Sequence, residues 1–104
     1  MQSSRLITFL PGAVLAALLG VAGCQTAPPV QEMSDARQAI TAAKEAGAAE
    51  HASNDLKAAV DFLESAEQSI NSKNYAQARR DALQAKAKAH EALKLSEKGQ
   101  EESP

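Results

Sequence analysis

Alanine at helical spacing is the feature that most restricts the folds open to this chain. The chain has 104 residues, and 19 alanines follow position 24. Between residues 75 and 98 small residues recur every three or four positions, which places them on a single helix face. Alanine is the strongest helix former, and the sequence lacks the alternation typical of a strand. We therefore predict an all-α domain. The stripe in this segment comprises Tyr75, Ala78, Ala82, Ala85, Ala89 and Ala92.

Three helices are predicted, at residues 34–46, 54–71 and 75–98, and together they form an Ala-rich domain over residues 34–98. Ser34 and Ser53 are the predicted N-caps of the first two helices. Gly47 can end the first helix in a left-handed conformation. A polar turn at residues 71–74 makes the second and third helices an antiparallel hairpin within a short three-helix bundle. The apolar stripes are Ala36, Ala39, Ile40 and Ala43 in the first helix, and Leu56, Ala59, Val60, Leu63, Ala66 and Ile70 in the second.

Such a bundle has a thin hydrophobic core. Alanine seams let helix axes approach closely but bury little area per residue. A domain of fewer than roughly 80 residues is marginally stable on such a core, so we expect self-association or docking on a partner. Most of the large apolar area must come from Leu56, Phe62, Leu63, Ile70, Tyr75, Leu83 and Leu93.

Opposite charges on the second and third helices support the hairpin. If the chain reverses near Ser72, then Glu67 pairs with Arg79 or Arg80, and Asp61 pairs with Lys86. Exposed pairs contribute only ~0–1 kcal/mol each, so they would select the register more than they stabilise it.

The first 23 residues have the three parts of a secretory signal peptide. Arg5 supplies a positive charge, an apolar stretch runs from Leu6 to Leu19, and small residues precede Cys24. An apolar stretch of this length lies between an h-region and a membrane-spanning helix, so its length does not decide the matter. Cys24 is the only cysteine, which excludes an intramolecular disulfide or a cysteine cluster for a metal.

Val21, Ala22, Gly23 and Cys24 resemble the lipobox of bacterial lipoproteins. The resemblance implies cleavage between Gly23 and Cys24 and attachment of acyl chains such as palmitate at Cys24. Two or more chains give stable membrane anchoring. Gln25 stands where an aspartate would favour the inner membrane, which indicates the outer membrane, facing the periplasm. Residues 24–33, which contain a proline pair, are then the lipidated cysteine and a flexible tether, and residues 99–104 are a flexible tail.

Two longer resemblances concern the helices. Asn74, Tyr75 and the alanines after them resemble the second helix of a tetratricopeptide repeat (TPR), over about one repeat, which we interpret as TPR-like hairpin geometry. Residues 33 to about 95 look like domain-of-unknown-function family 4398, an Ala-rich family of bacterial lipoproteins. That similarity rests on the runs Ser34–Ile40, Ala46–Ala48 and Asn74–Arg79. It implies an envelope location and a helical fold, and it transfers no catalytic residue.

The sequence gives no pattern for catalysis, a metal or another cofactor. His51 and His90 lie on separate segments without a second ligand at metal-binding spacing, so we expect surface histidines and no enzyme. The net charge of −2 gives no reason to expect nucleic acid as a partner. One surface feature is a basic ridge of residues spaced by four on the third helix, which either binds an anionic polymer or is a solvated face: Lys86, His90, Lys94 and Lys98.

Two functions remain open at this point. The first is a structural or adaptor lipoprotein that presents a helical module to an envelope protein or to a second copy of itself. The alternative is non-covalent binding of peptidoglycan or another anionic glycan through the basic ridge.

Overall fold

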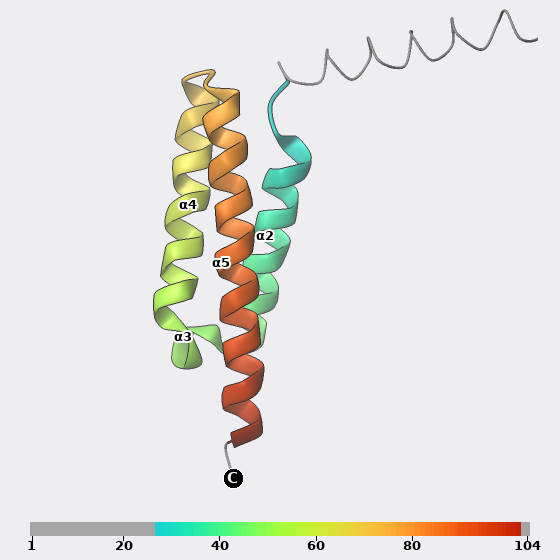
Figure 1. Cartoon of the computed structure of the whole chain (residues 1–104), viewed down its shortest axis with the longest axis vertical. Coiled ribbons are helices and arrows are strands. Elements are labelled where there is room, and N and C mark those ends of the chain that lie inside the picture. The colour runs from blue at the N-terminus through green and yellow to red at the C-terminus, as the bar shows by residue number, and fades with distance from the viewer. Residues whose placement is uncertain (1–26, 103–104) are drawn as a thin grey trace, which may run out of the picture.

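The computed structural model describes residues 27–102 and contains four α-helices there. They are α2 (Val30–Glu45), α3 (Ala48–His51), α4 (Ser53–Asn71) and α5 (Tyr75–Glu102). In Figure 1, α2 and α5 run in the same direction and α4 runs opposite to both. This confirms an all-α bundle of three long helices in which α4 and α5 form an antiparallel hairpin. The single turn of α3 was not predicted.

The alanine stripe of α5 is the centre of the packing. All five of its alanines have no exposed surface, and α5 packs most extensively on α4 and also along α2. The predicted stripe of α2 is likewise buried. The stripe of α4 is fully buried only at Ala59 and Ala66, whereas its larger members are half-buried. The small side chains therefore lie where helices approach closely, as the sequence predicted.

Larger apolar side chains fill the space around this stripe. Three side chains of α4 pack against the buried cluster that contains Ile40 and Ala89: Leu56, Val60 and Leu63. Met33, which the sequence analysis assigned to the tether, is a core residue beside Ala66 and Ala82. Its buried side chain therefore adds to the core a large apolar group that the predicted stripes did not include.

Leu83 does not supply core area as predicted, because it is 49% exposed. The position that continues the buried face of α5 is instead Asp81, which is 7% exposed. Leu83 lies two positions further along, a rotation of about 200° around a helix, which turns its side chain outward.

The first helix begins at Val30, before the predicted start at Ser34. Pro29 is the residue that precedes it, and its carbonyl accepts a hydrogen bond from the N–H of Met33 at 3.0 Å. Proline is tolerated at a helix start because the first N–H groups have no intrahelical acceptor. Residues 30–33 are therefore helical and not part of a flexible tether, and Ser34 is not the N-cap.

The start of α4 also differs from its prediction. Ser53 is the first residue of α4, and Ala52 precedes it without a side-chain cap. The N–H of Leu56 bonds to the carbonyl of Ala52 at 3.0 Å, and the preceding turn of α3 takes up the linker. Ser53 is therefore not the N-cap of α4, because it already lies inside the helix.

Both corners of the bundle contain a left-handed residue. Gly47, between α2 and α3, has φ 91°, as the sequence predicted. Lys73, between α4 and α5, has φ 62°. The N–H of Lys73 bonds to the carbonyl of Ile70, and that of Asn74 to the carbonyl of Ser69, which is the Schellman arrangement of a helix C-terminus. Asn74 then caps α5, because its side-chain oxygen accepts from the N–H of Gln77 at 3.4 Å.

The last helix is longer than predicted and continues through Glu102, so residues 99–102 are not a flexible tail. Gln100 reaches across the bundle and donates to the carbonyl of Ala46 at 2.5 Å. Gly99 lies against His51, so closely that a methyl group there would stand 2.7 Å from the His51 Nδ1 atom. The end of α5 is therefore attached to the corner formed by α2 and α3.

Candidate functional site

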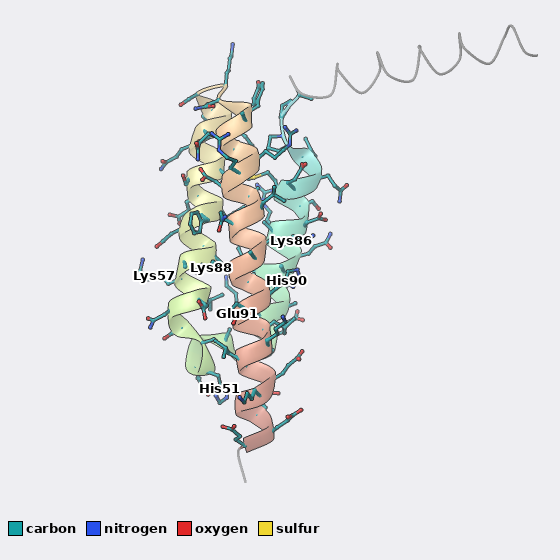
Figure 2. All side chains as sticks on the ribbon, viewed as in Figure 1. His51, Lys57, Lys86, Lys88, His90 and Glu91 are labelled. Carbon is teal, nitrogen blue, oxygen red and sulfur yellow. The ribbon has the colours of Figure 1, made fainter. Side chains whose placement is uncertain are left out.

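The basic ridge lies along the outer part of α5, and its four residues are not equivalent. His90, Lys94 and Lys98 are exposed, whereas Lys86 is half-buried. Figure 2 shows Lys86 and His90 one turn apart on α5, near its boundary with α2. The Lys86 Nζ atom lies 3.7 Å from Asp35 Oδ2 of α2. Lys86 therefore already has an acidic neighbour, and the free positive charge of the ridge is concentrated at its far half.

The predicted pairing of charges between α4 and α5 is wrong. Arg79 donates to Glu32 Oε1 at 3.2 Å, and Lys86 faces Asp35, so both cations pair with α2. Asp61 instead pairs with Lys57 on its own helix at 2.8 Å. Because α5 lies between two neighbours, a cation at the edge of its buried face can turn to either of them, and the sequence does not say which.

Among the ionisable groups of residues 27–102, Lys57 is the one with a resolved change in pKa. The hydrogen bond that Lys57 donates to Asp61, together with the charge of that carboxylate, raises the pKa of Lys57 above its ordinary value of 10.5. The amine is fully exposed, so the change reflects a surface ion pair and not a buried reactive group.

A polar cluster at the interface of α4 and α5 was not predicted. Asp81 is nearly buried, and it accepts hydrogen bonds from Ser65 at 2.8 Å and from Gln77 at 2.9 Å. Ser96 is fully buried and donates to the carbonyl of Ala92 at 2.7 Å. The spacing could have revealed both: Asp81 lies four positions before Ala85, and Ser96 four after Ala92. These side chains satisfy their own polar groups within the packing, as buried polar groups usually must.

Two open grooves lie beside α2. One, of about 420 Å³, follows the boundary with α5 and is lined by Asp35, Gln38, Ala39, Ala42, Lys86 and His90. The other, of about 340 Å³, lies where α2 begins and α4 ends, and is lined by Pro28, Val30, Met33, Arg37, Glu67, Ile70 and Asn71. The first places the start of the basic ridge next to a polar recess. The second combines apolar and charged side chains at one end of the bundle.

The remaining predicted positions are easily placed. His51 is exposed on α3 and Tyr75 is half-buried as the first residue of α5. Gly23 and Cys24 lie outside the described residues. Within residues 27–102 no cluster of three metal-ligating side chains is found, and no helix there has the length and apolar character needed to cross a membrane.

Comparison with other proteins identifies a family but no activity. No curated protein matches this chain, and no solved structure matches it. The family model described as Domain of unknown function (DUF4398) matches residues 31–103, which covers the whole bundle from the first turn of α2 to the end of α5. The buried alanine stripes and the hairpin of α4 and α5 all lie inside this match. The chain belongs to the DUF4398 family.

Proposed function

We propose that this protein is a bacterial envelope lipoprotein, anchored through acyl chains on Cys24, that presents its three-helix bundle as a non-enzymatic interaction module. The observation that carries the proposal is the order of segments along the chain. A signal-like segment and the lipobox-like residues Val21 to Cys24 stand directly before a folded bundle, with three residues between Cys24 and Pro28. An extended segment of this length spans at most ~14 Å, so anchored acyl chains would hold the bundle at the membrane surface.

The surface of the bundle supports a role in binding another protein or a second copy. Leu83 and Leu95 of α5 are 49% and 41% exposed, and Leu83 lies outside the core to which the sequence assigned it. Large apolar side chains left at a surface add little to the stability of the monomer, and they bury further area when a partner covers them. We place the module on the outer membrane, facing the periplasm, because Gln25 lacks the acidic side chain that would favour the inner membrane.

Lipid attachment is tested by labelling cells that express the full chain with a chemically tagged palmitate. We expect label on the wild-type chain and none on the Cys24→Ala variant, with the wild type in the membrane fraction. A shift to a longer, unprocessed chain in the presence of an inhibitor of the lipoprotein signal peptidase would support cleavage before Cys24. Equal labelling of both chains, or a wild-type chain free of membranes, would refute the anchor.

The adaptor role is tested by placing a photo-crosslinking amino acid at Leu83 or Leu95 in cells. A discrete crosslinked species at these positions, and none from a crosslinker at the exposed Lys57, is the expected result. Analytical ultracentrifugation of residues 25–104 then separates a second copy from another protein. A strict monomer that yields no crosslink at either leucine would contradict an interaction module.

The polar groove beside the basic ridge favours a second candidate, binding of peptidoglycan or another anionic glycan. His90 lines that recess, and Lys94 and Lys98 are exposed on the following turns of α5. Replacing Lys86, Lys94 and Lys98 together with glutamate should abolish sedimentation of the protein with purified cell walls. Sedimentation that is unchanged in this variant would remove the candidate.

A further inference from the structure

The bundle has two unlike ends. At one end, called here the turn end, the start of α2 lies beside the turn between α4 and α5 (Figure 1). The groove that Pro28 and Val30 share with Ile70 and Asn71 brings these segments together. At the other end, called here the α3 end, α3 packs against the last turns of α5. Because Cys24 precedes Pro28 by only four positions, an anchor at Cys24 would bring the turn end and not the α3 end to the membrane.

The turn end exposes apolar side chains. Val30 is 72% exposed, the largest value among the exposed large hydrophobic residues described for this chain, and Pro28 beside it is exposed as well. Ile70 is half-buried in the same groove. In water this apolar area is unfavourable, and in the boundary between headgroups and acyl chains it would be buried.

The charges at the two ends have opposite signs. Residues 27–33 and 71–80 of the turn end contain three cations and one acid, and that acid, Glu32, is paired with Arg79. Lys73 and Arg80 remain exposed. Residues 44–51 and 97–102 of the α3 end contain five acids and two lysines. An anionic lipid surface would attract the first end and repel the second.

We propose that the turn end, through Pro28, Val30, Lys73 and Arg80, contacts the headgroup region of an anionic bilayer, so that the bundle stands with its α3 end away from the membrane. The proposal deepens the lipoprotein function above and rests on it, because the anchor at Cys24 supplies the proximity. The long axis of α5, ~42 Å for its 28 residues, then carries the far half of the basic ridge away from the lipid.

The absence of tryptophan from the chain allows a direct test. The full chain, purified from bacterial membranes, is reconstituted into vesicles of phosphatidylethanolamine and phosphatidylglycerol with brominated acyl chains, which quench tryptophan at short range. One reporter is Ser72→Trp in the turn, and the matched reporter is Ala49→Trp on α3; both positions are exposed. We expect the Ser72→Trp emission to be strongly quenched and the Ala49→Trp emission to be almost unchanged.

Two changes should weaken the contact without removing the anchor. Adding Val30→Asp, Lys73→Glu and Arg80→Glu to the Ser72→Trp chain should restore most of its emission, whereas Lys94→Glu with Lys98→Glu should leave quenching in place. Replacing phosphatidylglycerol with brominated phosphatidylcholine should weaken quenching with no change in the protein. Circular dichroism confirms that each variant remains helical, and the lipid exchange still tests the proposal should the triple variant unfold.

The outcomes separate this proposal from the anchor. Chains that float with the vesicles but show no quenching at Ser72→Trp retain the anchor and overturn the membrane contact. Equal quenching of both reporters overturns the upright orientation. Absent quenching at Ser72→Trp, together with a crosslink between the turn ends of two chains, assigns the turn end to a second copy and overturns the contact. Chains that do not float with vesicles refute the lipoprotein function itself.

Discussion

The two corners of the bundle use the same left-handed backbone conformation but place different residues in it. Both place one residue in the left-handed region, Gly47 at φ 91° and Lys73 at φ 62°. A left-handed conformation costs an L-residue with a side chain roughly 1–2 kcal/mol, whereas glycine adopts it freely. The difference between them lies in the surroundings. A methyl group on Gly47 would lie 3.4 Å from both Gln100 and His51, whereas the Lys73 side chain is exposed.

Both corners therefore use the left-handed conformation, but Gly47 also lies against side chains of α3 and α5, whereas Lys73 faces solvent. At the α3 end a methyl group on Gly47 would make ordinary van der Waals contacts, so the left-handed backbone is what favours glycine there. At the turn end only the backbone conformation constrains the residue, so a side chain with another use can stand there. A lysine at this position is consistent with the proposed contact with anionic lipid.

The largest effect is expected from Gly47→Ala. Because the left-handed backbone is strained for a residue with a side chain, the variant should destabilise the bundle by about 1–2 kcal/mol. Urea denaturation of residues 25–104, followed by circular dichroism, measures the change. The matched control is Lys73→Ala, which keeps a non-glycine residue at the other corner and should change the free energy of unfolding by less than about 0.5 kcal/mol. Equal losses at the two corners would remove the distinction between them.

A smaller effect is expected from Gln100→Ala at the α3 end. The variant loses the hydrogen bond to the Ala46 carbonyl, a contribution of about 0.5–1.5 kcal/mol. Hydrogen exchange should show faster opening of the last turn of α5, with the rest of the helix unaffected. Glu101→Ala, at the neighbouring exposed position, should leave exchange unchanged. Protection that survives in Gln100→Ala would mean that this side chain does not hold the helix end.

At the turn end we expect a substitution that stabilises the bundle, which is the opposite of the effect at Gly47. Lys73→Gly should stabilise the bundle by about 0.5–1 kcal/mol, because it relieves the left-handed lysine in an already exposed turn. Thermal denaturation detects this as a higher Tm. The same variant should weaken quenching of the Ser72→Trp reporter in anionic vesicles. A lower Tm would show that the Lys73 side chain stabilises the turn more than its backbone strains it.

The smallest change in the free energy of unfolding is expected from the ion pair of Lys57 and Asp61, which lies on α4 away from both corners. Asp61 raises the pKa of Lys57 above 10.5, so the pair stabilises the folded state fully below that pH. Its contribution is lost as the pH rises through the higher pKa of the folded protein. The difference in unfolding free energy between the wild type and Lys57→Gln should therefore be small near neutral pH and vanish at strongly alkaline pH. A difference that is constant over this range would exclude the ion pair as its origin.

Much of the fold could be predicted because the spacing of the alanines indicates which face of each helix is buried. The stripe of α5 and the glycine of the first corner were found from spacing and residue type alone. The apolar pattern did not predict burial at polar residues, as at Asp81 and Ser96. It also failed at Met33, since the neighbouring proline pair suggested a tether and only packing against Ala66 and Ala82 shows a helix.

The candidate site was only partly predictable. The positions of the basic ridge followed from a spacing of four on one helix, and three of its residues are exposed. The pairing of Lys86 with Asp35 did not follow, because periodicity defines a face of α5 without saying which helix lies beside it. The groove at the turn end was also missed, since its lining residues come from segments about 40 positions apart in the sequence.

The sequence by itself determined that this protein is helical, where its three long helices run and which small residues they bury. Helix propensity and spacing are local properties, and they can be recognised within a single segment. Only the tertiary structure decided where the helices end, which charges pair and which end of the bundle holds the start of α2. Those features depend on contacts between distant segments, such as Gln100 with Ala46 and Arg79 with Glu32. Their free energies arise only after the helices have packed.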